Sequence, residues 1–162
     1  MINWFICFSR HGKIRLKRWF VSASQAQVAK QCNEAITLVL ARKPSMCNIL
    51  ELREKKLIYR RYASLFFMCC VDFEDNELIT LEIIHRYVQI LDEHFGNVCE
   101  LDIVYGMQEA FVILDEIMMN GELVESSKKA VVGAVKKMNS QEQQEATLGD
   151  EALTAPKLAV RG

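Results

Sequence analysis

The sequence predicts an α+β domain in which one five-stranded antiparallel sheet is flanked by helices, in the order ββαβββααα. Three observations carry this prediction. The hydrophobic period is two in some segments and 3.6 in others. The connections between the three middle strands are short, which favours antiparallel neighbours. The chain has 162 residues, of which 51% are hydrophobic, enough for one core of ordinary domain size.

The first 20 residues are expected to form a hairpin. Residues 2–8 are apolar at most positions and predict a strand covered on both faces, whereas residues 14–20 alternate like a half-exposed strand. Ile14 and Leu16 are expected on one face of that strand, with the basic residues between them on the other. Gly12 supplies the positive φ that a tight turn needs.

After the hairpin, the hydrophobic period changes from two to 3.6 and then returns to the period of strands. Apolar residues recur at helical spacing over residues 24–42, where Ser22 or Ser24 can cap the start and Pro44 prevents continuation. Three strands follow as an antiparallel meander, and the last is almost wholly apolar, as a central strand would be. Their expected ranges are 47–52, 56–62 and 64–73.

Helices dominate the remainder of the chain. A helix over residues 75–95 is expected to end at Gly96, and residues 97–105 form a short irregular or helical link. Further helices are expected over residues 107–119, ended by Asn120-Gly121, and from a cap at Ser126 or Ser127 to about Met138. The domain is therefore expected to span residues 1–138, with a polar, disordered tail over residues 139–162.

Charge and hydropathy exclude several classes of protein. Twenty basic residues against 21 acidic ones give a net charge of -1, which argues against general binding of nucleic acid. No apolar run reaches the roughly 18 residues that a membrane span requires. The basic residues follow the first apolar segment instead of preceding it, unlike a secretory signal. We therefore expect a cytosolic protein.

No catalytic constellation is evident, so we expect no enzymatic activity, no metal and no cofactor. The sequence has neither a zinc-type ligand spacing nor a glycine-rich phosphate loop. Adjacent Cys69 and Cys70 lie in an apolar strand, so they are expected to face opposite sides of the sheet as core residues. The alternative is a Cys–His pair, drawn from Cys69, Cys70 and Cys99 with His11, His85 and His94.

A basic cluster spans Arg10 to Arg18, with five positive charges and no acid. It can be a solvated hairpin face, or it can contact an acidic peptide, a partner subunit or anionic lipid. Lys55-Lys56 and Arg60-Arg61 would extend it if their strands are neighbours.

Several long motifs together resemble the small (sigma) subunits of clathrin adaptor complexes, in collinear order over residues 1–138. Two of them fall in the predicted hairpins and three in the helical part. They are SRHGKIRL at residues 9–16, YRRYASLFF at 59–67, DNELITLE at 75–82, IHRYVQIL at 84–91 and NVCELD at 97–102.

The resemblance implies a longin-like domain without catalytic activity or cofactor. It implies a place in a clathrin-associated heterotetramer that takes part in vesicle-mediated protein transport, with the clathrin coat as an indirect partner. The partners would be a large subunit of gamma or alpha type, a large beta-type subunit and a medium mu subunit. The motifs are more similar to the trans-Golgi and endosomal adaptor, so the complex would sit peripherally on those membranes and on coated vesicles.

The resemblance also implies a site for acidic dileucine sorting signals on cargo tails. Its leucine pocket carries over to Ala63, Leu65, Val88, Asn97, Val98 and Ile103. Arg15 matches the basic residue that contacts the signal's acidic position. Leu52 and Tyr105-Gly106 depart from the family pattern. Two alternative functions are a free-standing longin-type regulator of membrane fusion or of small GTPases, and a purely structural adaptor subunit.

Overall fold

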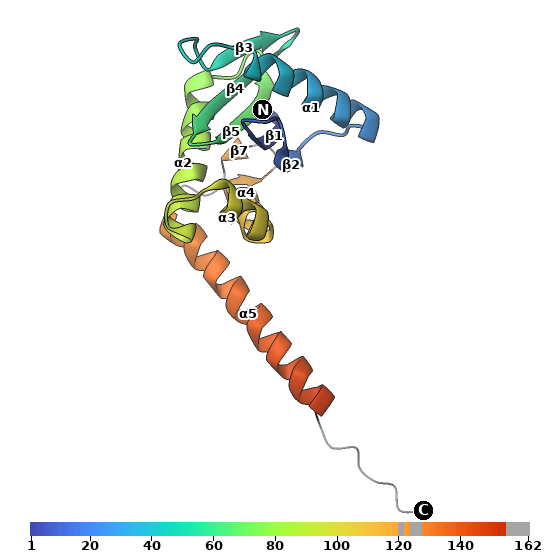
Figure 1. Ribbon diagram of the computed structural model, residues 1–162, viewed down its shortest axis with the longest axis vertical. Helices are drawn as coiled ribbons and strands as arrows, with labels where there is room; N and C mark the ends of the chain where they lie inside the picture. Colours follow the sequence, from blue (N-terminus) through green and yellow to red (C-terminus); the bar gives the residue numbers. More distant parts are fainter. Residues whose placement is uncertain (120–121, 124–127, 155–162) are drawn as a thin grey trace, which may run out of the picture.

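The computed structural model describes residues 1–119, 122–123 and 128–154. Five antiparallel strands form one sheet in the order β2-β1-β5-β4-β3 (Figure 1), which confirms the predicted sheet and its meander. The apolar strand β5 is the central one. The strands are β1 (Ile2–Ser9), β2 (Ile14–Trp19), β3 (Ile49–Leu52), β4 (Lys55–Tyr62) and β5 (Leu65–Asp72).

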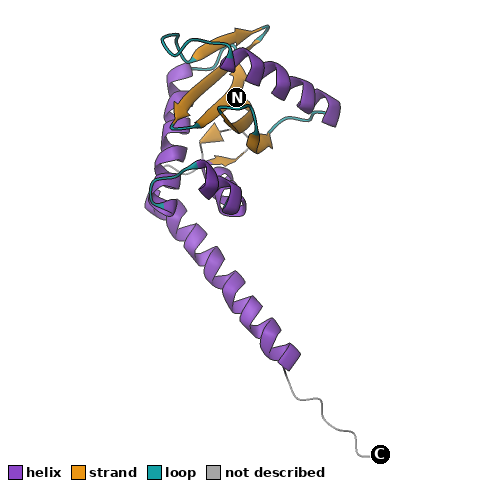
Figure 2. Ribbon diagram, viewed as in Figure 1, coloured by secondary structure: helices purple, strands orange, loops and turns teal. Residues whose placement is uncertain are grey.

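Helices cover both faces of this sheet (Figure 2). Helix α1 (Gln25–Leu40) packs on one face, and α2 (Glu77–Phe95) with α4 (Met107–Ile117) packs on the other. Successive residues of β5 therefore enter different cores. Cys69 belongs to the cluster under α2 and Cys70 to the cluster under α1, which confirms their predicted opposite orientation.

The helix ends follow the predicted signals. Ser24 caps α1 in a capping box with Gln27, the Gln27 N–H donating to the Ser24 hydroxyl at 3.3 Å. Gly96 ends α2 in a left-handed conformation with φ 68°. Asn76 caps the start of α2 by accepting from the Leu78 N–H at 2.9 Å.

One prediction for the first hairpin is wrong. Cys7 lies opposite Leu16 but Phe8 lies opposite Ile14, so the register shifts and Arg15 is an extra residue in β2. Residues opposite each other share a face, and Cys7 and Phe8 belong to different cores. Ile14 and Leu16 therefore face opposite sides of the sheet, because the bulge reverses the alternation.

The chain after α2 follows the prediction in part. The link contains helix α3 (Glu100–Tyr105), the helical one of the two expected forms. The helix expected over residues 107–119 ends at Ile117, and a short antiparallel pair follows, β6 (Met118–Met119) with β7 (Glu122–Leu123). The predicted stop at residues 120–121 and the predicted caps at residues 126–127 lie outside the described residues.

The last helix is longer than expected. Helix α5 (Lys128–Thr154) passes Met138, the predicted end, and its second half projects from the domain (Figure 1). Residues 140–148 are exposed but helical, whereas the sequence predicts a disordered tail from residue 139. Gln, Glu and Ala dominate this stretch, and they favour helix without any apolar face. Residues 155–162 lie outside the described residues. Among the described helices, none is long and apolar enough to cross a membrane.

Candidate functional site

The predicted pocket residues come from three segments, and the apolar ones among them share the core on the α2 face. The floor consists of Leu65 on β5, Val88 on α2 and Ile103 on α3, which belong to one hydrophobic cluster and are 2%, 2% and 0% exposed. Val98 is partly buried and packs against that cluster. The four apolar residues thus belong to or pack against the same core, and three of them are covered.

The other two predicted pocket residues, Ala63 and Asn97, are exposed and left-handed. Ala63 forms the β4–β5 turn with φ 52°, and Asn97 follows the end of α2 with φ 63°. Asn tolerates this conformation better than most residues. Asp92 then fixes the turn, because its Oδ1 accepts from the Val98 N–H at 2.9 Å. Two successive left-handed residues, Gly96 and Asn97, thus bend the chain sharply enough to set Val98 against the cluster.

Arg15 lies beside this region because of the bulge in β2. Its Nη2 and Nε donate to Oε1 of Glu100 at 2.6 and 2.9 Å. Glu100 opens α3, two residues after Val98, and both side chains are about a quarter exposed, at 27% and 28%. Arg15, the residue predicted to contact the acidic position of a sorting signal, is therefore a partly exposed cation that already binds the carboxylate of Glu100.

A polar pair that the sequence does not reveal lies on the same side of the sheet. The Tyr62 hydroxyl lies 3.1 Å from Nδ1 of His85, and the side-chain amide of Gln89 lies 2.8 Å from the other ring nitrogen. Burial is the main reason why the pKa of Tyr62 is raised. His85 precedes Val88 by one helical turn, so this pair fixes the β4 edge of the site to α2. No local pattern joins residues 23 positions apart.

The groups considered for catalysis do not assemble. His11 contacts Arg10, His85 contacts Tyr62 and Gln89, and His94 contacts Glu109. Burial raises the pKa of Cys69 far above its ordinary value and that of Cys70 to about 12, so both thiols stay neutral. Within the described ranges, no three potential ligands gather in a way that could hold a metal ion.

Comparison with known proteins gives the family. Residues 1–142 match the model of the clathrin adaptor complex small chain, and the chain belongs to that family. It is thus a subunit of a multi-subunit adaptor complex in vesicle transport and not an enzyme.

The relatives are similar over most of their length. The human AP-1 complex subunit sigma-1A is 50% identical over 135 residues, 83% of this chain and 85% of the relative. The AP-1 complex subunit sigma-1 of Schizosaccharomyces pombe is 48% identical over 134 residues, 83% of each chain. The AP-1 complex subunit sigma-2 of Arabidopsis thaliana is 50% identical over 131 residues, 81% of each chain.

A structural comparison agrees on the fold. A chain from a homology model of the full-length AP-3 complex, in a stretched open conformation, superposes with a TM-score of 0.70. The match covers 91% of this chain and 98% of the other, at 22% sequence identity. The longin-like α+β architecture predicted from the sequence is thereby confirmed.

Proposed function

We propose that this chain helps its adaptor complex to recognise acidic dileucine signals, [Asp/Glu]-x-x-x-Leu-[Leu/Ile], on cargo tails. The observation that carries the proposal is the arrangement at the α2–α3 junction. The partly buried Val98 packs against an apolar cluster that contains Leu65, Val88 and Ile103, and the cation Arg15 holds Glu100, two residues after Val98. The leucines would enter the cluster while the acidic residue engages Arg15.

The leucine subsite must open before it can bind. Its floor residues expose 2% or less of their surface, so Val98 and the Asn97 turn must move to admit a side chain. Burying each leucine contributes about 1.5–3 kcal/mol. The association entropy and the opening of the site offset much of that gain, which leads to an affinity of about micromolar or weaker.

Arg15 would serve selectivity more than affinity. A carboxylate of the signal must share or displace Glu100, which now accepts two hydrogen bonds from Arg15. The net gain is therefore small, about 0–1 kcal/mol for a partly exposed pair. A signal without the acidic residue leaves the Arg15–Glu100 pair intact. Such a signal binds without the small additional free energy that its own carboxylate would contribute.

The same proposal extends to the partners and the location. We assign the chain to a complex of AP-1 type with gamma, beta and mu subunits, acting at trans-Golgi and endosomal membranes, because the relatives from human, fission yeast and Arabidopsis carry AP-1 names. Exposed apolar side chains support packing against a large subunit. Leu78 and Ile79 on α2 are 73% and 59% exposed, and Leu101 and Tyr105 on α3 are 61% and 85% exposed.

The test is peptide binding to a complex reconstituted from the full chain and the three other subunits. A fluorescent acidic dileucine peptide is compared with a double-alanine peptide and with one whose acidic residue is Gln. Val98→Ser tests the leucine subsite, because Val98 is partly exposed and outside the fully buried core. Val88→Asp is a poor test, since Val88 is 2% exposed and a buried carboxylate would disturb the core.

Arg15→Gln tests the acidic subsite, and Arg18→Gln is its matched control. Both arginines lie on β2 and pair with a helix carboxylate, Arg18 with Asp115 at 3.1 Å. We expect Val98→Ser to weaken binding of the acidic dileucine peptide. Arg15→Gln, but not Arg18→Gln, should abolish the preference for the acidic peptide. Binding that survives Val98→Ser and Arg15→Gln unchanged in an assembled complex would leave a purely structural subunit.

A further inference from the structure

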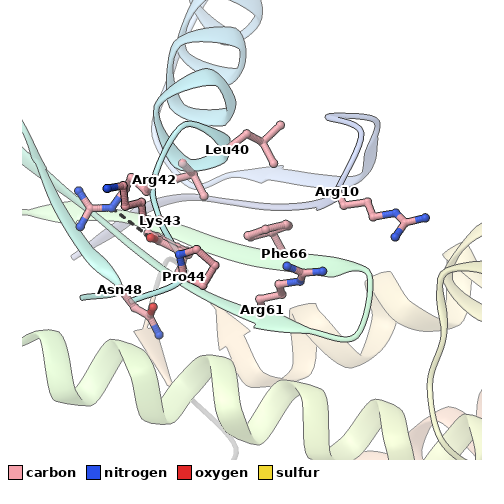
Figure 3. Close-up of a pocket in the computed structure, with 10 residues that line it drawn as sticks. Arg10, Leu40, Arg42, Lys43, Pro44, Asn48, Arg61 and Phe66 are labelled. Atoms are coloured by element: carbon pink, nitrogen blue, oxygen red, sulfur yellow. Dashed lines mark hydrogen bonds between the residues drawn. The ribbon is translucent and has the colours of Figure 1, made fainter. Parts of the chain in front are cut away.

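A second pocket lies on the opposite face of the sheet, where α1 ends beside the β4–β5 hairpin (Figure 3). It has a volume of about 390 Å³. Tyr59 and Phe66 form its floor and are only 6% and 9% exposed. Leu40 and Pro44 contribute an apolar wall. The pocket thus has an apolar base and wall, and its remaining lining is polar.

Four cations from three separate segments line this pocket. Arg10 comes from the first hairpin, Arg42 and Lys43 follow α1, and Arg61 belongs to β4. Figure 3 shows Arg10 and Arg61 on one side and Arg42 and Lys43 on the other. Among the residues that the structure describes, none of the four forms an ion pair, and the pocket lining includes no acid.

Several cations elsewhere in the fold are compensated by a carboxylate. Arg15, Arg18, Lys55 and Lys56 each pair with a carboxylate of a strand or helix packed nearby. The pocket therefore concentrates positive charge that the chain leaves uncompensated. Such a concentration is unfavourable by itself and becomes favourable when an anion binds.

Two of the guanidinium groups are already held in place. Nε of Arg42 donates to the Tyr59 hydroxyl at 3.1 Å, and its Nη2 donates to the Cys47 carbonyl at 2.8 Å. Arg61 donates to the Ala63 carbonyl at 3.0 Å and lies over the Phe66 ring, 5.6 Å from its centroid. These contacts restrict the side chains before a ligand arrives, so less conformational entropy is lost on binding.

Arg42 also has a structural role. It bonds the chain after α1 to β4, and a cation at the carboxyl end of a helix offsets the negative end of the helix dipole. That role does not account for Arg10 and Arg61. Arg10 lies in the β1–β2 turn and Arg61 lies in β4, so neither belongs to the segment that ends α1.

We propose that this pocket binds a small ligand that carries clustered phosphate groups. Guanidinium groups match phosphate oxygens in a bidentate way. Each phosphomonoester carries about -1.5 to -2 charges near neutral pH, so about two of them balance the four cations. Leu40, Pro44 and Phe66 would contact the carbon skeleton that holds the phosphates. The source can be a soluble polyphosphate or a lipid headgroup, which share this chemistry.

This site is independent of the proposed dileucine site. Phe66 belongs to the core under α1, whereas its neighbour Leu65 belongs to the core under α2. The two sites therefore share one hairpin but open on opposite faces of the sheet.

The test uses the full chain assembled with the other adaptor subunits. Soluble binding is measured by calorimetry with inositol hexakisphosphate. Membrane binding is measured by co-sedimentation with phosphatidylcholine vesicles that contain either phosphatidylinositol bisphosphate or, at equal charge, phosphatidylserine. The pocket variant is Arg10→Gln with Lys43→Gln, both exposed and away from the core. The control is Lys17→Gln with Lys30→Gln, which removes the same charge from exposed positions outside the pocket.

We expect the pocket variant to weaken binding by about tenfold or more and the control by less than about twofold, with unchanged assembly. Loss in the soluble arm identifies a free polyphosphate, and loss in the vesicle arm alone identifies a lipid headgroup. Equal weakening by both variants would overturn the proposal, because only net charge would matter. A poly-glutamate peptide that competes as well as the phosphorylated probe would overturn it in favour of an acidic protein partner.

Discussion

Gly106 stands where α3 meets α4, at one of the positions that depart from the family pattern, and a side chain there has no room. A Cβ added at Gly106 would lie 2.6 Å from Cε1 and 2.7 Å from Cζ of Phe95, and 2.9 Å from the backbone oxygen of Asp102. Ordinary contacts are about 3.5–4.0 Å, so the overlap is close to 1 Å. The ring tip can turn away, but the Asp102 oxygen can retreat only if α3 shifts.

The expected cost follows from these contacts. Overpacking of this kind destabilises a domain by about 1–3 kcal/mol, and the loss of glycine's freedom in the unfolded chain returns about 0.4–1 kcal/mol. Gly106→Ala should therefore lower the free energy of unfolding by roughly 1–2 kcal/mol. Gly133 in α5 provides the matched control, because a Cβ added there meets nothing within 4 Å. Gly133→Ala should stabilise by about 0.5–1 kcal/mol.

The assay is thermal unfolding of the full chain, followed by circular dichroism. For a chain of this length about 1 kcal/mol corresponds to roughly 2–4 °C in Tm, so the two variants should move in opposite directions from the parent. Phe95→Leu in the Gly106→Ala background should recover part of the loss, because it removes the ring atoms that clash. An unchanged or raised Tm for Gly106→Ala would refute the packing argument.

Three further outcomes follow from single contacts. Hydrogen bonds from Lys55 and Asn3 hold the pKa of Asp72 well below its usual range. The ionised carboxylate therefore stabilises the folded chain above about pH 4, and this contribution is lost as the pH falls further. The difference in free energy of unfolding between the parent and Asp72→Asn should narrow below that pH in acid denaturation curves. The buried Tyr87 hydroxyl donates to the Ala110 carbonyl at 2.9 Å, and Tyr87→Phe should cost about 1–1.5 kcal/mol in urea unfolding, whereas no change would show that the bond contributes nothing net. A thiol reagent should label the exposed Cys47 and Cys99 in the native chain and the buried Cys7, Cys69 and Cys70 only after unfolding, and native labelling of Cys69, read by mass spectrometry, would contradict its burial.

The candidate site was partly accessible to sequence reasoning. The resemblance named Leu65, Val88 and Ile103, and the structure places all three in one buried cluster. Nothing in the sequence indicated that this cluster would be covered or that Arg15 would already hold Glu100. Both features depend on the approach of α3 to β2, and no local period encodes contacts between residues 85 positions apart.

The basic pocket illustrates the same limit. The sequence indicated a basic cluster from Arg10 to Arg18, but the fold divides it. Arg15 and Arg18 pair with carboxylates of α3 and α4. Arg10 instead lines the pocket on the α1 face together with Arg42 and Arg61. The bulge in β2 accounts for the position of Arg15, because it reverses the side-chain alternation between Ile14 and Leu16.

The sequence by itself determined the elements whose signals are local. Ser24 and Gly96 set helix ends through their own backbone preferences, and the alternation through Cys69 and Cys70 assigned each thiol to its face of the sheet. Only the tertiary structure decided which charges are compensated and which remain open. That outcome depends on the register of β1 against β2 and on the packing of helices against the sheet, where many weak contacts distant in sequence act together.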